Sequence, residues 1–221
     1  MGYCLRNNLS ILATRPKDDL TTNYLFYWAG LVIEETIRKG CQIFDLKEKR
    51  ANRKEFCGII NKIKPELLFL NGHGNRNVIT GHDQEILIQS DDNEDITKGS
   101  IVYALSCRAA EILGLKCVQK GAKSFIGYKN DFIFLTEQSF ITHPLSDRTA
   151  ALFLRPSNLI VTSLIKGKTV IDSCKRSQDE FKRNIRKLST SESPQEDKSS
   201  IRFLLWDMQA QVCLGNPEAK I

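Results

Sequence analysis

Two residues that could carry acyl-transfer chemistry each come directly after an apolar run. The segment 67–74 (LLFLNGHG) ends in His73 and Gly74, and the segment 101–107 (IVYALSC) ends in Cys107. A thiol becomes a nucleophilic thiolate at neutral pH when a nearby base takes its proton, and an imidazole can be that base. The two segments therefore predict a histidine–cysteine dyad, provided that the fold brings them together.

The positions of His73 and Cys107 favour such a meeting. Each is expected at the carboxyl end of a strand, and in a parallel sheet the carboxyl ends of neighbouring strands meet at one edge. Gly72 and Gly74 flank the histidine and permit tight turns. We expect Cys107 to open a helix, whose amino terminus would lower the pKa of the thiol and offer N–H groups to an oxyanion.

The elements that must position these residues alternate along the first part of the chain. We expect strands at residues 9–13, 41–46, 67–73, 101–107 and 123–128, and helices at residues 20–39, 50–63 and 109–119. A small hairpin is expected at 78–88, inserted after the histidine strand. This alternation predicts an α/β protein with three layers and a mostly parallel central sheet, joined by right-handed crossovers.

The last third of the chain is predicted to be mainly helical. We expect helices at residues 147–154, 164–188 and 200–214, and an exposed, mobile loop at 189–199, which is rich in Ser, Glu, Gln and Asp. A length of 221 residues suits a single buried core, and no internal repeat is visible. The whole chain, 1–221, is therefore predicted to be one domain.

Composition and charge exclude several classes of function. No segment reaches the roughly 20 apolar residues that span a bilayer, and the amino terminus lacks the order of a secretory signal, so we expect a cytoplasmic protein without membrane contact. The net charge of +6 is spread out, and its densest part, 175–187, is interleaved with acidic residues. This pattern favours the solvated face of a helix over a basic patch, and we do not expect direct binding of nucleic acid.

The cysteines do not suggest a metal site or a redox motif. There are seven, at Cys4, Cys41, Cys57, Cys107, Cys117, Cys174 and Cys213. They are widely spaced and form no Cys-x-x-Cys pair, so most are expected to be small buried hydrophobes. His82 and His143 are expected to be turn residues. No metal or organic cofactor is expected, and no P-loop or dinucleotide fingerprint is present.

The histidine and cysteine segments resemble those of a known group, the caspase-like cysteine proteases. This group includes caspases, gingipains, clostripain, separases and the CHAT-type proteases. The resemblance is carried by His73-Gly74 and by Ser106-Cys107, with Arg108 similar to the Cys-Arg of caspases. The segments 121–127 (GAKSFIG) and 214–217 (LGNP) resemble stretches of the CHAT and gingipain-like branches, although an asparagine stands where aspartate is common. Together these matches cover roughly residues 65–131 and the last 20 residues.

The resemblance implies a caspase-like sandwich and a mechanism. Cys107 would be the nucleophile, and His73 would activate it or protonate the leaving amine. The backbone N–H groups of Gly74 and Cys107 would form the oxyanion hole. A protein or peptide substrate would be cleaved through a thioester acyl-enzyme, without a cofactor. The family's regulatory roles imply a separate activating or recruiting protein as a partner.

The resemblance also points to loops that would select the residue before the cut. In the family, the loops after the first and fifth strands line that pocket, and here they carry Asp19 and Asp131. Carboxylates would select Arg or Lys, whereas Arg15 would select an acidic residue. Of these two specificities we favour a basic residue, selected through Asp19 or Asp131. The alternative that these are only solvated loop charges is the more common case for such residues and stays open.

Two other readings of the sequence remain open. One is a catalytically silent, caspase-like binding or scaffold module with a closed pocket. The other is a cysteine hydrolase or amidotransferase with another α/β fold, although such glutaminases place the cysteine before the histidine and within Gly-x-Cys-x-Gly. The sequence does not specify the natural substrate, the activating signal, self-cleavage or the oligomeric state.

Overall fold

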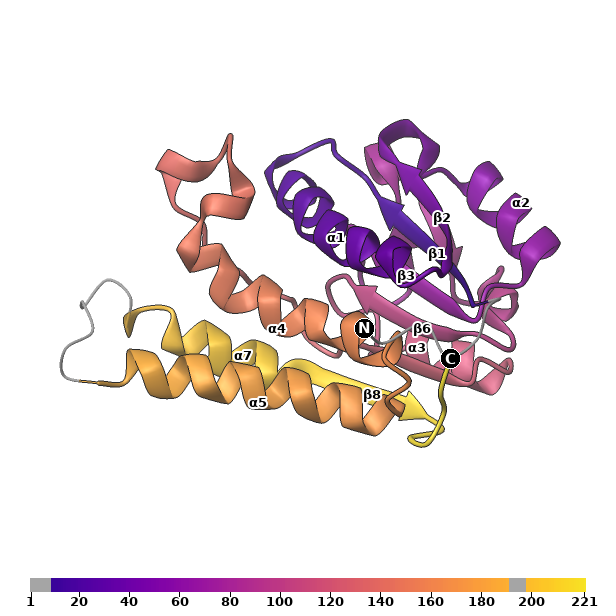
Figure 1. The fold of residues 1–221 in the computed structure, drawn as a ribbon. Coiled ribbons are helices and arrows are strands. Elements are labelled where there is room, and N and C mark those ends of the chain that lie inside the picture. The colour runs from indigo at the N-terminus through magenta and orange to yellow at the C-terminus, as the bar shows by residue number, and fades with distance from the viewer. Residues whose placement is uncertain (1–8, 191–197) are drawn as a thin grey trace.

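The computed structural model describes residues 9–190 and 198–221, and a six-stranded sheet forms its centre (Figure 1). The strands are β1 (Ser10–Arg15), β2 (Gln42–Lys47), β3 (Leu67–Asn71), β6 (Ile101–Leu105), β7 (Ser124–Tyr128) and β8 (Gln211–Gly215). Their order in the sheet is β2-β1-β3-β6-β7-β8. All neighbouring pairs are parallel except β7 and β8, which are antiparallel. The prediction of a mostly parallel sheet is confirmed.

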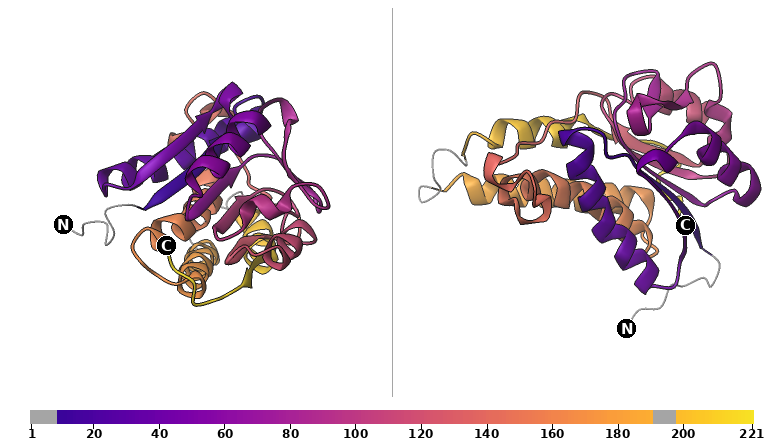
Figure 2. Two further views of the ribbon diagram at one scale, coloured as in Figure 1. Left: turned by 90° about the vertical axis from the view of Figure 1, so that its right-hand side faces the viewer. Right: turned by 90° about the horizontal axis from the view of Figure 1, so that it is seen from above.

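Helices cover both faces of this sheet. They are α1 (Leu20–Arg38), α2 (Arg53–Ile63), α3 (Leu113–Gln119), α4 (Arg148–Leu164), α5 (Val170–Leu188) and α7 (Ile201–Ala210). Figure 2 shows α2 and α3 on one face and α1, α4 and α5 on the other. Along β3, Leu67 and Phe69 enter the core on the α1 and α4 side, whereas Leu68 and Leu70 enter the core on the α2 side. A strand that is buried on both faces has apolar residues at successive positions, which explains the continuous apolar sequence of segment 67–70.

The hairpin after the histidine strand is present as predicted. Strands β4 (Val78–Thr80) and β5 (Ile86–Gln89) pair antiparallel and form a separate two-stranded sheet. Ile79 and Ile88 are fully buried in the core that α2 covers. The hairpin is therefore packed against the main sheet, next to the end of β3.

The expectation that Cys107 opens a helix is wrong. Residues 107–112 form turns, and α3 begins only at Leu113. Arg108 has a φ of 56°, and its N–H donates to the carbonyl of Asn130, while the N–H of Ala110 donates to the carbonyl of Tyr128. These two N–H groups therefore form hydrogen bonds with the last residue of β7 and with the loop after it, and not with carbonyls of a helical turn. The thiol is therefore not at the amino terminus of α3.

The predicted helix at 147–154 is too short, because α4 continues through Pro156. A proline in a helix leaves the carbonyl four residues earlier without its usual N–H donor. Here that carbonyl belongs to Leu152, and the side-chain amide of Asn184 in α5 donates to it at 2.8 Å. A side chain distant in sequence thus replaces the missing bond and lets the helix continue to Leu164.

The predicted boundaries of the last helices also need correction. Helix α5 begins at Val170 rather than at 164, because Gly167, with a φ of 76°, ends the preceding turn and Thr169 caps α5. The helix expected at 200–214 stops at Ala210, and Gln211–Gly215 is strand β8. Pairing with β7 satisfies backbone groups that the edge of the sheet would otherwise leave open.

Three further features complete the fold. A disulfide that the sequence did not suggest joins Cys174 of α5 to Cys213 of β8. The loop expected at 189–199 falls largely outside the described residues, which omit 191–197. In the part of the chain that the structure describes, no helix is long and apolar enough to cross a bilayer.

Candidate functional site

The fold brings the histidine and cysteine segments together. Strands β3 and β6 are parallel neighbours, and their last paired residues are Asn71 and Leu105, so His73 and Cys107 each follow two residues later. A Cβ added to Gly74 would lie 3.0 Å from the Cβ of Ser106 and 3.4 Å from the carbonyl oxygen of Cys107. The two chain segments that leave the sheet here are therefore in direct backbone contact.

The glycines beside His73 are required by the hairpin. Gly72 has a φ of +150°, and a Cβ there would lie 2.5 Å from the carbonyl oxygen of Thr80. A Cβ on Gly74 would lie 2.8 Å from the carbonyl oxygen of Val78. Strand β4 thus approaches more closely than any side chain would permit. This close packing fixes the backbone that carries His73.

The imidazole of His73 is held by a carboxylate. Its Nε2 donates to Oδ2 of Asp19 at 2.5 Å, and 34% of the histidine side chain is exposed. Asp19 is also the N-cap of α1, because its Oδ1 accepts from the N–H of Thr22 at 2.8 Å. Burial acts to raise the pKa of Asp19, but the hydrogen bonds from the Thr22 backbone and His73 outweigh burial and lower it. Asp19 is therefore an ionised partner that orients the ring.

The thiol of Cys107 is in a different environment. It is half-buried, and its Sγ donates to the carbonyl of Phe132 at 3.8 Å. Burial raises the pKa of the Cys107 thiol, and the nearby carboxylate of Asp131 acts in the same direction. Within residues 9–190 and 198–221, the hydrogen-bond partner of the thiol is thus Phe132 rather than His73. In this state the sulfur is a neutral thiol and not a thiolate.

A short segment after β7, residues 129–134, covers the thiol and is here called the cover segment. Helix α7 holds it at three points. Nε1 of Trp206 donates to the carbonyl of Asp131 at 2.8 Å, and the N–H of Ile133 donates to Oδ1 of Asp207 at 3.0 Å. The N–H of Lys129 donates to the carbonyl of Ala210 at 2.9 Å. The side chain of Trp206 is 43% exposed, whereas Asp207 is 0% exposed. The contact between Phe132 and the thiol therefore depends on α7.

Asp207 is an unusual carboxyl group. Its Oδ2 is buried and has no hydrogen-bond partner among the described residues. Burial raises the pKa of Asp207 well above the ordinary range, and the hydrogen bond from Ile133 offsets only part of that effect. Asp207 therefore keeps its proton to a higher pH than an ordinary carboxyl group does.

The structure places the expected specificity residues unequally. Asp131 is exposed and close enough to Cys107 to act on its charge. Asp19 is engaged by His73 and by the α1 cap. Arg15, the alternative, is buried and pairs with Asp45 at 2.5 Å, so it is not available to a substrate. Only Asp131 of these three presents a free charge beside the thiol.

In the part of the chain that the structure describes, no hydrogen bond or ion pair links the other histidines to His73 or Cys107. Nδ1 of His82 accepts from the N–H of Lys17 at 3.4 Å and lies 3.6 Å from Asp18, and His143 contacts Thr142. His82 lies in the turn between β4 and β5, as expected. Within the described ranges, His, Cys, Asp and Glu side chains form no cluster of three or more that could hold a metal ion.

Sequence reasoning missed the contribution of Phe132, Trp206 and Asp207. Nothing in their local sequence links them to the cysteine, since Trp206 lies 75 residues from Asp131 in the chain. One signal was available for Asp207, because an acidic residue at a buried position of an otherwise apolar helix needs a polar partner. No protein-family model matches this chain, and no significant match occurs among curated protein sequences.

Proposed function

We propose that this protein is a cysteine endopeptidase of the caspase-like kind, with Cys107 as nucleophile and His73 as the proton-transfer residue. One observation carries the proposal: β3 and β6 deliver both residues to the same sheet edge, where an ionised carboxylate already orients the imidazole. A histidine at a strand end is more often structural. A histidine held by a carboxylate and adjacent to a cysteine segment is the arrangement that nucleophilic catalysis uses.

The contact with Asp19 assigns the ring nitrogens. A carboxylate only accepts hydrogen bonds, so Nε2 of His73 carries a proton, and in the neutral ring Nδ1 has the lone pair. Nδ1 is then the atom that takes the proton of Cys107. In this proposal Asp19 positions His73 rather than binding substrate, and Asp131 is the residue that selects a basic side chain before the cut.

The proposed reaction follows the usual course of thiol proteases. The thiolate of Cys107 attacks the peptide carbonyl, and the backbone N–H groups of Gly74 and Cys107 stabilise the oxyanion. The imidazolium of His73 gives its proton to the leaving amine, which leaves a thioester on Cys107. Water then attacks the thioester, His73 accepts its proton, and the acid product and free thiol are released.

The cover segment supports a regulated enzyme. The thiol donates to Phe132, so this hydrogen bond must break, by movement of the cover segment or rotation of the thiol, before His73 can take the proton. A protein partner that displaces α7 or the cover segment would supply this movement, in agreement with the expected activating partner. The proposed location is the cytoplasm, although disulfides such as Cys174–Cys213 are rare there.

The test is hydrolysis of a mixed fluorogenic peptide library by the wild type, Cys107→Ala and His73→Ala, with His143→Ala as the matched histidine control. We expect turnover by the wild type and His143→Ala, its loss in the other two variants, and cuts after Arg or Lys. Equal turnover in the wild type and Cys107→Ala would overturn the assignment. Cuts after apolar residues alone would overturn the role of Asp131.

A scaffold function is the second candidate, and a specific observation favours it. The thiol is bonded to the cover segment, its pKa is raised, and no base contacts it among the described residues. A scaffold would keep this closed state. The two functions differ in whether the reactivity of Cys107 depends on His73 once the cover segment is loosened, and this dependence can be measured directly.

A further inference from the structure

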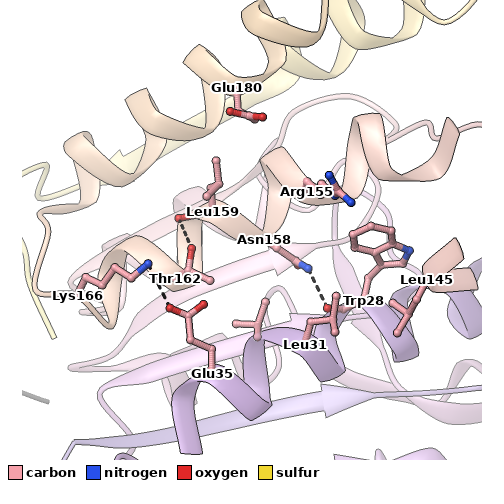
Figure 3. Close-up of a pocket in the computed structure, with 11 residues that line it drawn as sticks. Trp28, Leu31, Glu35, Leu145, Arg155, Asn158, Leu159, Thr162, Lys166 and Glu180 are labelled. Carbon is pink, nitrogen blue, oxygen red and sulfur yellow. Dashed lines mark hydrogen bonds and ion pairs between the residues drawn. The ribbon is translucent and has the colours of Figure 1, made fainter. Parts of the chain in front are cut away.

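A hollow on the helical side of the protein has no role in the proposed reaction. It lies between α1 and α4, below α5, and encloses about 400 Å³ (Figure 3). Small-molecule sites in proteins range from about 300 to 1,000 Å³. None of the residues that line it belongs to the histidine or cysteine segments or to the cover segment. The hollow is therefore separate from the candidate active site.

The size of the hollow suits a small molecule, and charged side chains lie at its ends. At one end, Nζ of Lys166 lies 3.2 Å from Oε1 of Glu35, and this ion pair joins α4 to α1. At the other end, Figure 3 shows Arg155 of α4, Trp28 of α1 and Leu145, which belongs to the 3₁₀ turn Pro144–Ser146. With a volume of about 400 Å³, the hollow has the size of a small-molecule site.

The walls of the hollow are apolar. Leu31 and Leu145 are exposed, and Leu159 is half-buried, while the more deeply placed Trp28 and Val32 are buried. The amide of Asn158 is already used, because it donates to the carbonyl of Trp28 at 2.9 Å. The sides therefore offer contact area to an apolar body and few free hydrogen-bonding groups.

The charges at the hollow leave one cation without a partner. Glu35 pairs with Lys166, and Glu180 pairs with Arg183 at 2.7 Å. Arg155 makes no hydrogen bond or ion pair with any residue in the described part of the chain. A guanidinium binds a carboxylate through two parallel hydrogen bonds. A single positive charge also matches the single charge of a carboxylate better than the double charge of a phosphate.

We propose that this hollow binds a small amphipathic carboxylate, whose apolar body packs on Trp28, Leu31 and Leu159 and whose carboxylate pairs with Arg155. A medium-chain fatty acid has this chemistry. The proposal does not depend on the proposed peptidase activity, since no residue of the dyad takes part. The two can therefore fail or succeed independently.

Tryptophan fluorescence can test the proposal, because the chain has two tryptophans and only Trp28 lines the hollow. In a Trp206→Phe background, Trp28 is the sole emitter. We expect octanoate to change its emission saturably, and 1-octanol, which has the same chain without the charge, to bind at least about tenfold more weakly. Octyl phosphate serves as the third probe and should not bind more tightly than octanoate.

Variants locate the site. Arg155→Gln should weaken the binding of octanoate at least about tenfold and leave the binding of 1-octanol unchanged, because it removes the charge from an exposed position. Leu31→Ala should weaken the binding of both ligands, since it removes apolar contact. Lys168→Gln, an exposed cation outside the hollow, is the matched control and should change neither. Circular dichroism confirms that each variant is folded.

Several results would overturn the inference. These are an absence of any saturable change with octanoate, equal affinity for octanoate and 1-octanol, or unchanged octanoate binding in folded Arg155→Gln. If octyl phosphate binds more tightly than octanoate, the hollow is a site for a phosphate and not for a carboxylate. Each readout is a binding measurement, so an inactive peptidase would not affect the outcome.

Discussion

Asp19 caps helix α1 and holds the imidazole of His73 with the same carboxylate. Its Oδ1 accepts from the N–H of Thr22 at 2.8 Å, and its Oδ2 accepts from Nε2 of His73 at 2.5 Å. The residues lie 54 positions apart in the chain. The start of α1 is thereby tied to the end of β3, and the orientation of the ring depends on how α1 begins.

Asp19→Asn should separate these two roles. Asparagine is an equally good N-cap, so we expect no change in the free energy of unfolding from the cap. The amide removes the negative charge and lets the ring take the other tautomer, and we expect kcat/KM for peptide hydrolysis to fall about 100-fold. Asp18→Asn is the matched control, because Asp18 lies beside His82 instead. Equal activity of the wild type and Asp19→Asn would contradict a positioning role.

Trp206→Phe should loosen the cover segment. It removes the hydrogen bond to the carbonyl of Asp131, worth about 1 kcal/mol, and so should raise the rate of Cys107 alkylation by iodoacetamide roughly fivefold. Trp28→Phe removes a similar bond, from Nε1 to the carbonyl of Pro144, which does not involve the cover segment, and serves as control. Mass spectrometry of the labelled peptides measures the rate at each cysteine.

The same variant separates a peptidase from a scaffold. If His73 is the base, the faster alkylation in Trp206→Phe should be lost when His73→Ala is added. If the protein is a scaffold, the double variant should react as quickly as Trp206→Phe alone. Faster alkylation in Trp28→Phe to the same extent would show that general loosening, rather than the cover segment, controls the thiol.

Asp207→Asn should stabilise the protein at high pH. Burial raises the pKa of Asp207 above its unfolded value of about 3.9, so the stability that its neutral form provides is complete below that value and is lost as pH rises through the folded pKa. Asparagine has the same shape and cannot ionise, and its Oδ1 can still accept from Ile133. Within that pH window, the free energy of unfolding of the variant should therefore rise relative to that of the wild type by up to about 1.4 kcal/mol per pH unit.

Urea denaturation at several pH values measures this difference. Asp179→Asn in α5 is a suitable control, since the side chain of Asp179 is 51% exposed and forms an ion pair with Lys182 at 3.5 Å. A difference between Asp207→Asn and the wild type that stays constant from pH 4 to pH 8 would show that Asp207 is not held neutral by burial.

Reduction of the disulfide between Cys174 and Cys213 should destabilise the fold. The bond closes a chain segment with a sequence separation of 39 residues, and loop-closure entropy predicts a loss of about 2–4 kcal/mol in the free energy of unfolding. Denaturation with and without reductant measures it. Cys174→Ser should show the loss without responding to reductant, while Cys57→Ser, a control at a free cysteine, should respond as the wild type does.

The sequence by itself determined the order and type of most elements. Apolar runs such as 67–70 are buried on both faces, and Asp19, Asn52 and Thr169 cap their helices through contacts three residues away. His73 and Cys107 could be placed at strand ends for the same reason. Signals of this kind are short in range, so they can be read without knowing the fold.

Only the tertiary structure decided which distant groups meet. The contact between His73 and Asp19, the cover over Cys107 and the bond from Asn184 that lets α4 pass Pro156 each join residues far apart in the chain. The same holds for β8, where pairing with β7 overrode the helical pattern at 211–214. Such contacts arise because packing the whole chain fixes partners for buried polar groups and open strand edges, and no local pattern of residues specifies those partners.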